Sequence, residues 1–204
     1  MDEIQDKAEL ELLSSGPENI AKVFSQYRDR LARLIHFRLD PRLLSRVEGD
    51  DILQEAYMEV QRRIQDFLDA PNVPFFIWAR QLTLQTLIDT QRRHLGAQMR
   101  DVKREVTMGQ KSPGMTNSFS IAAHLIGNIT SPSQAAVRQE QIDKIRIALE
   151  SMSEIDREVL VLRHLEELNN NEVAEVLSLD KSAASKRYIR ALQKLRSAVD
   201  SENL

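Results

Sequence analysis

The chain has 204 residues, enough for one large or two small domains, and its 42% hydrophobic content with few glycines and prolines favours a mostly helical protein over an all-β one. The absence of cysteine excludes disulfide bonds, thiolate metal sites and a cysteine nucleophile. The net charge of −3 disfavours a uniformly basic nucleic-acid binder, but acids dominate 1–18 and 40–69 whereas bases dominate 91–104 and 181–196, a segregation that predicts two kinds of partner.

The N-terminal part of the chain is predicted to contain two helices. Residues 1–17 form an acidic N-terminal extension, helical through Ser15 and closed by Gly16 and Pro17. One longer helix is expected over 18–38, because its apolar residues recur close to every 3.6 positions. The chain begins without the basic and apolar segments of a signal peptide, and no apolar run approaches membrane-spanning length. We therefore expect a cytoplasmic protein with no membrane insertion.

The next predicted helix, 50–67, has an apolar face and a mostly anionic face. Ile52, Ala56 and Val60 belong to the apolar face. The opposite stripe consists of Asp51, Gln54, Glu55 and Glu59. A solvated surface is the simplest interpretation of this stripe. A general acid–base role is disfavoured, because no histidine, nucleophile or glycine-rich loop accompanies the carboxylates.

A proline-containing loop, 70–74, leads into a third predicted helix over 75–94. The core candidates of this helix are Phe75, Trp78, Ala79, Leu82, Leu87 and Ile88. Its outward face is predicted to carry Arg80, Gln81, Gln85 and Gln91, with Arg92 and Arg93 at the end. Aromatic side chains followed by amides and cations can bind single-stranded nucleic acid. Equally, the aromatic residues can be core, and two arginines suit a helix C-terminus on dipole grounds.

Residues 96–134 lose the helical pattern and are predicted to be a flexible linker between two small helical domains. Glycine, proline and serine punctuate this range, which holds one short apolar piece at 121–126. Helices resume over 135–152 and 153–164. Ser153 and Asp156 form a Ser-x-x-Asp capping signal for the second of them.

The stretch 171–195 predicts a helix-turn-helix. A short helix over 172–177 buries Val173 and Ala174, and Asp180 is a good N-cap for a second helix that begins at Lys181. This second helix has an apolar inner stripe and no acidic residue before Asp200, the layout of a helix that binds DNA. Its outward or flanking residues are Lys181, Ser182, Ser185, Lys186, Arg187, Arg190 and Lys194. Small side chains would let the helix approach base edges, while the cations would neutralise phosphates.

Three motifs, in this order and spacing, resemble those of bacterial RNA polymerase sigma factors of the extracytoplasmic-function (ECF) type. The stretch from Glu48 to Tyr57, EGDDILQEAY, is similar to the helix with which the family docks on the clamp helices of the polymerase β′ subunit. Phe75–Trp78, Leu87–Asp89 and Arg92-Arg93 together resemble the helix that recognises and melts the −10 promoter element. The segment from Met152 to Leu195 is similar to the domain that reads the −35 element.

The resemblance implies an all-α protein with a sigma region 2-like domain over 18–95 and a region 4-like helix-turn-helix domain over 135–204. It implies two partners, promoter DNA and core RNA polymerase (the β′ clamp helices and the β flap), with an anti-sigma factor as a further one. The residues that it assigns to β′ are Asp50, Asp51, Gln54 and Glu55. Those that it places along the unwound −10 strand are Arg80, Gln81, Gln85, Arg92 and Arg93. The residues that it assigns to the −35 element are Lys181, Ser182, Ser185, Lys186 and Arg187 in the major groove, with Arg190 and Lys194 on phosphates. Ser178 stands where the family's turn usually has glycine, so it is expected to adopt the left-handed conformation.

A stand-alone helix-turn-helix regulator with an N-terminal sensor or dimerisation domain is the alternative. It predicts tight binding to duplex DNA without polymerase and a symmetric footprint. An enzyme is not expected, nor is a cofactor or a metal site, because the four histidines are scattered without the spacing of metal ligands.

Overall fold

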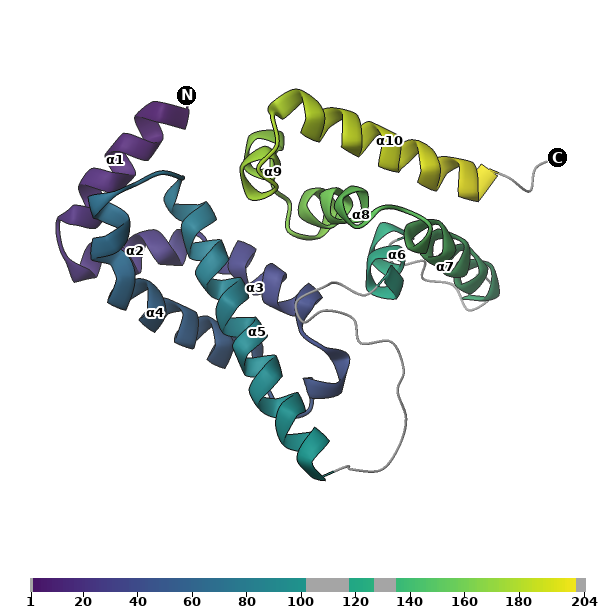
Figure 1. Ribbon diagram of the computed structural model, residues 1–204, viewed down its shortest axis with the longest axis horizontal. Helices are drawn as coiled ribbons and strands as arrows, with labels where there is room; N and C mark the ends of the chain where they lie inside the picture. The colour runs from purple at the N-terminus through teal and green to yellow at the C-terminus, as the bar shows by residue number, and fades with distance from the viewer. Residues whose placement is uncertain (1, 102–117, 127–134, 201–204) are drawn as a thin grey trace. The chain divides into compact units, whose positions relative to one another are not determined.

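The computed structural model describes residues 2–101, 118–126 and 135–200, and all regular structure in these ranges is helical (Figure 1). The chain divides into two compact units, residues 1–115 and 116–204. The prediction of an all-α protein built from two small helical domains is therefore confirmed. Among the described residues, no helix combines the length and the apolar character needed to cross a membrane.

Over its described residues, 2–101, the first unit is a bundle of five α-helices and one 3₁₀ turn. These elements are α1 (Asp2–Ser14), α2 (Pro17–Gln26), α3 (Arg28–Arg38), the turn Pro41–Leu43, α4 (Gly49–Asp69) and α5 (Phe75–Asp101). Helices α3, α4 and α5 pack against one another, and α1 packs on α2 and on α5. The core residues of the three central helices include Leu31, Leu34, Ile35, Ile52, Ala56, Val60, Phe75 and Leu87. The acidic extension thus supplies a packed helix, since its Leu13 is 1% exposed.

The single helix predicted over 18–38 is wrong, because the chain breaks at Tyr27 into α2 and α3. Tyr27 (φ −99°, ψ 0°) forms a turn between the two helices. Its ring centroid lies 5.1 Å from that of Phe76, and its hydroxyl donates a hydrogen bond of 2.7 Å to Glu9. Contacts with residues far away in the sequence thus hold Tyr27 at the break. Apolar periodicity within one segment cannot reveal them.

The second unit contains the predicted helix-turn-helix and the helices that support it. Its elements are α6 (Ser118–Ile126), α7 (Ala135–Glu150), α8 (Glu154–Leu160), a π-helical turn η3 (Val161–Leu165), α9 (Asn170–Val176) and α10 (Lys181–Asp200). Helix α10 packs against α7, α8 and α9, and α6 packs against α7 and η3. Residues with no more than 1% exposure form the core, among them Ile121, Leu149, Leu160, Leu162, Leu165, Val173, Ala184 and Ala191.

Two predictions about the middle of the chain need correction. The predicted linker, 96–134, overlaps the last turns of α5 and contains α6, whose Ile121 and Ala122 are fully buried in the second unit. The apolar piece at 121–126 is therefore part of a core, and 102–117 and 127–134 lie outside the described residues. The helix predicted over 153–164 is α-helical only to Leu160 and continues as the π-helical turn.

Candidate nucleic-acid and protein interfaces

A capping box fixes the start of α9, the first helix of the helix-turn-helix. The side-chain oxygen of Asn169 accepts hydrogen bonds from the backbone N–H groups of Asn171 (2.9 Å) and Glu172 (3.0 Å). In return, the Glu172 carboxylate accepts one from the Asn169 N–H at 2.8 Å. This reciprocal arrangement satisfies donors that would otherwise be unpaired at a helix N-terminus. The sequence prediction began this helix two residues late, although the Asn-x-x-Glu pattern is visible in the sequence.

The turn between α9 and α10 has the geometry that the sequence predicts. Ser178 has φ 51°, so it is left-handed, as expected for a residue in the position of a glycine. Leu179 N–H closes the turn by donating to the carbonyl of Ala174 at 2.8 Å. Asp180 caps α10, because its carboxylate accepts a hydrogen bond of 2.7 Å from Ala183 N–H. The predicted N-cap is confirmed.

Asn170 on α9 forms hydrogen bonds with α10, a contact that the sequence did not predict. Its amide nitrogen donates to the backbone carbonyl of Lys181 at 3.0 Å, and its amide oxygen accepts from the Ser185 hydroxyl at 3.0 Å. Both bonds hold the first turns of α10 in one orientation. Ser185, a predicted DNA-binding residue, is thus half-buried and engaged within the protein.

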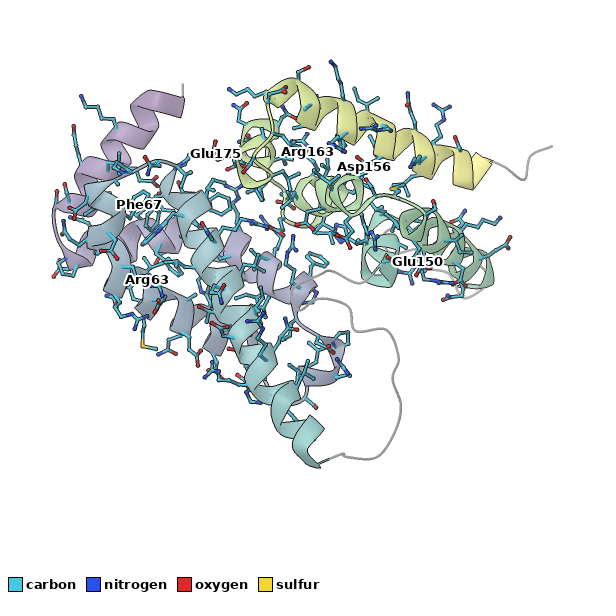
Figure 2. The ribbon with its side chains drawn as sticks, viewed as in Figure 1. Arg63, Phe67, Glu150, Asp156, Arg163 and Glu175 are labelled. Atoms are coloured by element: carbon cyan, nitrogen blue, oxygen red, sulfur yellow. The ribbon has the colours of Figure 1, made fainter. Side chains whose placement is uncertain are left out.

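Asp156, which is labelled in Figure 2, pairs with Arg187, another predicted DNA-binding residue. The Arg187 guanidinium donates a hydrogen bond of 3.0 Å to the Asp156 carboxylate, and Arg190 lies 3.8 Å from the same oxygen. The Asp156 side chain is 7% exposed. Burial alone would raise the pKa of Asp156. Hydrogen bonds from Ser153 and Arg187, with the charges of Arg190 and Arg187, outweigh burial and hold the pKa below its ordinary value.

Tyr188 and His164 continue the contact between α10 and the helical segment beneath it. The Tyr188 hydroxyl lies 3.2 Å from Nε2 of His164, and the Arg163 guanidinium lies over the Tyr188 ring at 5.2 Å. Burial, assisted by the charges of Arg163 and His124, lowers the pKa of His164. Tyr188 is thus part of the inner face of α10.

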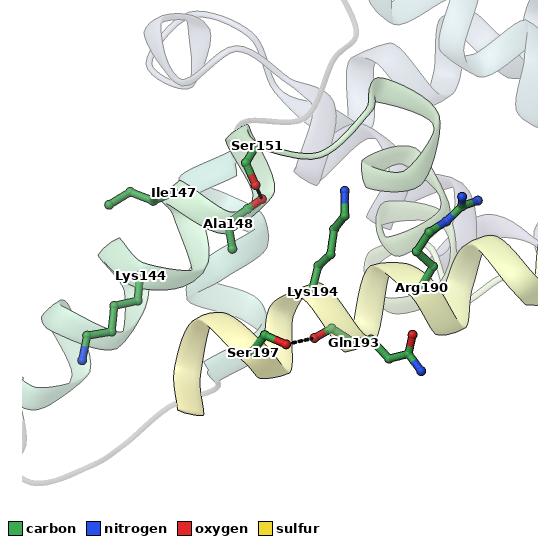
Figure 3. A pocket seen from close by; sticks show the side chains of 8 residues that line it. All are labelled: Lys144, Ile147, Ala148, Ser151, Arg190, Gln193, Lys194 and Ser197. Carbon is green, nitrogen blue, oxygen red and sulfur yellow. Dashed lines mark hydrogen bonds between the residues drawn. The ribbon is translucent and has the colours of Figure 1, made fainter. Parts of the chain in front are cut away.

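The remaining predicted residues of α10 form its exposed face. Lys181, Ser182, Lys186, Arg190 and Lys194 are all exposed. A groove of about 550 Å³ runs beside Arg190 and Lys194, between α10 and α7 (Figure 3). Its lining residues are Lys144, Ile147, Ala148, Ser151, Arg190, Gln193, Lys194 and Ser197. The exposed face of α10 is therefore strongly basic, in contrast to the chain as a whole.

The predicted polymerase-binding residues lie together at the N-terminal end of α4. Asp50, Asp51 and Gln54 are exposed and Glu55 is half-buried. Arg28 lies 2.8 Å from the Asp50 carboxylate. The anionic stripe stops after Glu55, because Arg62 and Arg63 both pair with Glu59 (Arg63 is labelled in Figure 2). The hydrogen bond from Arg62 lowers the pKa of Glu59 despite the opposing effect of burial, and the charges of both arginines add to it.

Helix α5 presents only part of the outward face that the sequence predicts. Gln81, Gln85, Arg92 and Arg93 are exposed, but Arg80 is 5% exposed and Gln91 is 3% exposed. The amide oxygen of Gln91 accepts a hydrogen bond from the Asp40 backbone N–H at 2.8 Å, which ties α5 to the loop after α3. The prediction that Arg80 and Gln91 face outward is therefore wrong. Other elements cover α5 on more than one side, so more of its circumference is buried than in a simple amphipathic helix.

Ion pairs and hydrogen bonds connect the exposed residues of α5. Arg93 donates a hydrogen bond of 2.8 Å to Glu55 on α4, so a predicted DNA-binding residue contacts a predicted polymerase-binding one. Gln85 donates to Asp89 at 3.0 Å, and Arg92 lies 3.9 Å from the same carboxylate group. Of these five side chains, Glu55 is half-buried and the other four are exposed, and ion pairs at such positions are weak and can exchange for external partners.

The aromatic residues near the loop 70–74 are mainly core. Phe75 and Phe76 are 2% and 4% exposed, so the core interpretation applies to them. Trp78 is half-buried and stacks on Phe67 at 4.7 Å between ring centroids (Phe67 is labelled in Figure 2). Of these aromatic side chains, Trp78 is the one with surface available beside the loop. In the described parts of the chain, no group of three or more acidic or histidine side chains is placed to hold a metal ion.

Comparisons with known proteins agree with this arrangement. Residues 148–197, which span most of α8 to α10, match the family described as Sigma-70, region 4. The chain is 23% identical over 196 residues to the ECF RNA polymerase sigma factor SigW of Bacillus subtilis (strain 168), covering 95% of this chain and 96% of SigW. It is 20% identical over 199 residues to the ECF RNA polymerase sigma-E factor of Haemophilus influenzae, covering 97% of each.

The fold is also similar to that of CnrH, solved in complex with the cytosolic domain of CnrY. The TM-score is 0.51 at 20% identity, with 97% of this chain and 98% of the CnrH chain covered. This likeness extends over both units of the fold. The chain thus contains a segment that matches sigma-70 region 4, and along nearly its whole length it is similar to sigma factors of the extracytoplasmic-function type.

Proposed function

We propose that this chain acts as a dissociable subunit of RNA polymerase that directs promoter recognition, promoter melting and the initiation of transcription. The observation that carries the proposal is the helix-turn-helix formed by α9 and α10, a capped pair of helices with a basic exposed face. All but its last three residues lie inside the segment 148–197 that matches sigma region 4. As a polymerase subunit, the protein would act in the cytoplasm.

The second unit would read the −35 element in duplex DNA. Lys181, Ser182 and Lys186 point outward from the first two turns of α10, where recognition helices contact bases and phosphates. Arg190 and Lys194 would hold phosphates further along the groove. Arg187 and Ser185, by contrast, would support the helix from within, because Asp156 and Asn170 already engage them.

The first unit would bind core polymerase and the unwound −10 strand. Asp50, Asp51, Gln54 and Glu55 would contact the β′ clamp helices. Gln81, Gln85, Arg92 and Arg93 would line the path of the single strand, and Trp78 beside the loop 70–74 would offer an aromatic surface for an unstacked base. Arg80 has no place in this surface except as support from within, because it is buried.

A protein partner that holds the chain inactive is a further part of the proposal. CnrH, which shares the fold, has been solved with the cytosolic domain of CnrY bound. A corresponding anti-sigma partner of this chain would have to cover the anionic end of α4 or the basic face of α10, because these surfaces would contact polymerase and DNA. Contacts with the β flap would fall on the second unit.

Reconstitution with core RNA polymerase tests the function directly. The purified chain is added to cognate core polymerase and a library of promoter fragments, and run-off transcripts are sequenced. We expect transcripts that share two upstream elements, together with weak binding of the chain alone to the same duplexes. Absence of both core binding and specific transcripts would refute the proposal. Tight duplex binding without polymerase and a symmetric footprint would support the stand-alone regulator instead.

A further inference from the structure

Ile189 is an exposed apolar side chain in the middle of the basic face of α10. It is 54% exposed, one of four large hydrophobic residues that are prominently exposed in the described parts of the chain. The inner face of the same helix is complete without it, because Ala184, Ala191 and Leu195 are buried there. Packing within the unit thus gives no reason for an isoleucine at this position.

Ile189 shares its side of the helix with the residues proposed to enter the major groove. At 100° per residue, Ser182, Lys186 and Ile189 fall within about 60° of the helix circumference. The positions 182, 185, 186 and 189 follow the i, i+3, i+4, i+7 spacing with which recognition helices read successive bases. Exposed Ser182 and Lys186 are therefore the neighbours of Ile189 on the surface that would face DNA.

The chemistry of an isoleucine restricts what it can recognise in a groove. Its side chain has no hydrogen-bond donor or acceptor and cannot neutralise a phosphate. The one apolar group that base edges present in the major groove is the 5-methyl group of thymine. Contact between the two would remove apolar surface of both from water, whereas a hydrogen-bonding edge opposite Ile189 would lose its water without compensation.

We propose that Ile189 is a specificity-determining residue that selects thymine in the upstream promoter element by contacting the thymine 5-methyl group. The inference rests on the proposed function, because it requires α10 to lie in the major groove. The polar residues Ser182 and Lys186 then position the helix and bind polar edges or phosphates. Ile189 adds a preference at one base pair that charge alone cannot provide.

A coupling experiment between protein and DNA tests the proposal. Holoenzyme reconstituted from the full chain and core polymerase is used to select a duplex from a random library. Each thymine in the stretch protected by the second unit is then replaced singly by deoxyuridine, which lacks only the 5-methyl group. We expect one replacement to weaken wild-type holoenzyme binding about fourfold, as for loss of one buried methyl contact. The variant Ile189→Ala should bind the thymine and deoxyuridine duplexes equally.

Two further variants separate the possible failures. Ile147→Ala removes another exposed isoleucine (60% exposed) on α7 and should leave the thymine preference unchanged. Lys186→Ala should weaken binding to every duplex while keeping that preference. If Lys186→Ala has no effect, α10 does not bind DNA and the proposed function fails at this helix. If Lys186→Ala weakens binding but Ile189→Ala retains the full thymine preference, only the assignment of Ile189 is overturned.

Discussion

Asp156 helps to fix the orientation of α10, the helix that we propose to bind DNA. Its buried carboxylate lies on α8, and both arginines that approach it, at 3.0 Å and 3.8 Å, come from α10. A buried carboxylate is expensive to leave unpaired, whereas one paired with a guanidinium fixes the distance between two helices. The sequence predicted that Arg187 binds DNA, because it lies on a basic helix. Its acidic partner Asp156 is on another helix, 31 residues earlier in the chain, and could not be predicted from the local pattern.

The variant Asp156→Asn should lower the free energy of unfolding of the second unit by about 1.5–3 kcal/mol, the value of a hydrogen bond to a charged group. The matched control Asp143→Asn removes a carboxylate that pairs with Arg146 but is 45% exposed, so it should cost less than about 0.5 kcal/mol. Chemical unfolding can be followed in two ways. Far-UV circular dichroism detects both units, whereas the single tryptophan, Trp78, reports on the first. A shift of the Trp78 transition equal to the dichroism shift would contradict a local effect.

The difference in unfolding free energy between the wild type and Asp156→Asn should decrease at low pH. Because the pKa of Asp156 is lower in the folded protein, its contribution is fully present above the unfolded value of about 3.9 and is lost as the pH falls through the folded value. The difference in unfolding free energy between the wild type and Asp156→Asn should thus stay constant from about pH 7 to pH 5 and shrink below about pH 4. A difference that grows towards low pH would show that the carboxylate is not stabilised by its arginines.

At the scale of elements, local patterns predicted most helices but not the contacts that end or bury them. The helix predicted over 50–67 is observed as Gly49–Asp69, because an apolar stripe and an acidic first turn are local features. The break at Tyr27 and the burial of Arg80 and Gln91 depend instead on neighbouring helices. Asn170 illustrates the same limit at the candidate site, since its partners Lys181 and Ser185 lie 11 and 15 residues away.

The turn between α9 and α10 offers a prediction at the same scale. Ser178 is left-handed, a conformation that costs a residue with a side chain about 1–2 kcal/mol, while glycine adopts it freely but loses more chain entropy on folding. The substitution Ser178→Gly should therefore stabilise the second unit by about 0.5 kcal/mol, measured by chemical unfolding. As a control, Ser197→Gly makes the same chemical change at an exposed position within α10 and should destabilise by about 0.5 kcal/mol. Loss of stability in both variants would contradict strain at Ser178.

The whole molecule gathers its charges into separate surfaces, an acidic one at the start of α4 and a basic one on α10, which reconciles a net charge of −3 with DNA binding. The acidic end of α4 belongs to the first unit and the basic face of α10 to the second. A bipartite reader of this kind needs only modest affinity from each unit, because attachment to polymerase raises the effective concentration of the other contacts. The sequence alone revealed this division, since charge segregation and motif order are visible without any tertiary contact.

Separate loss of the two functions should follow from this division. Asp51→Lys reverses an exposed charge at the proposed polymerase surface and should weaken binding to core polymerase by about tenfold or more, so that promoter-specific transcription is lost as well. Lys186→Ala should leave core affinity unchanged and reduce transcription alone, because its contact is with DNA. Core affinity is measured by competition against labelled wild-type chain, and transcription by run-off product.

Asp66→Lys is the control for position, because it makes the same charge change on exposed surface of the same helix, about 22 Å further along α4. It should leave core affinity within about twofold of wild type, whereas a general effect of charge would weaken binding in both variants. Wild-type core affinity in Asp51→Lys would refute the assignment of the α4 surface. Lost core affinity in Lys186→Ala would instead show that α10 itself contacts the polymerase, so that binding of polymerase and binding of DNA are not separated between α4 and α10.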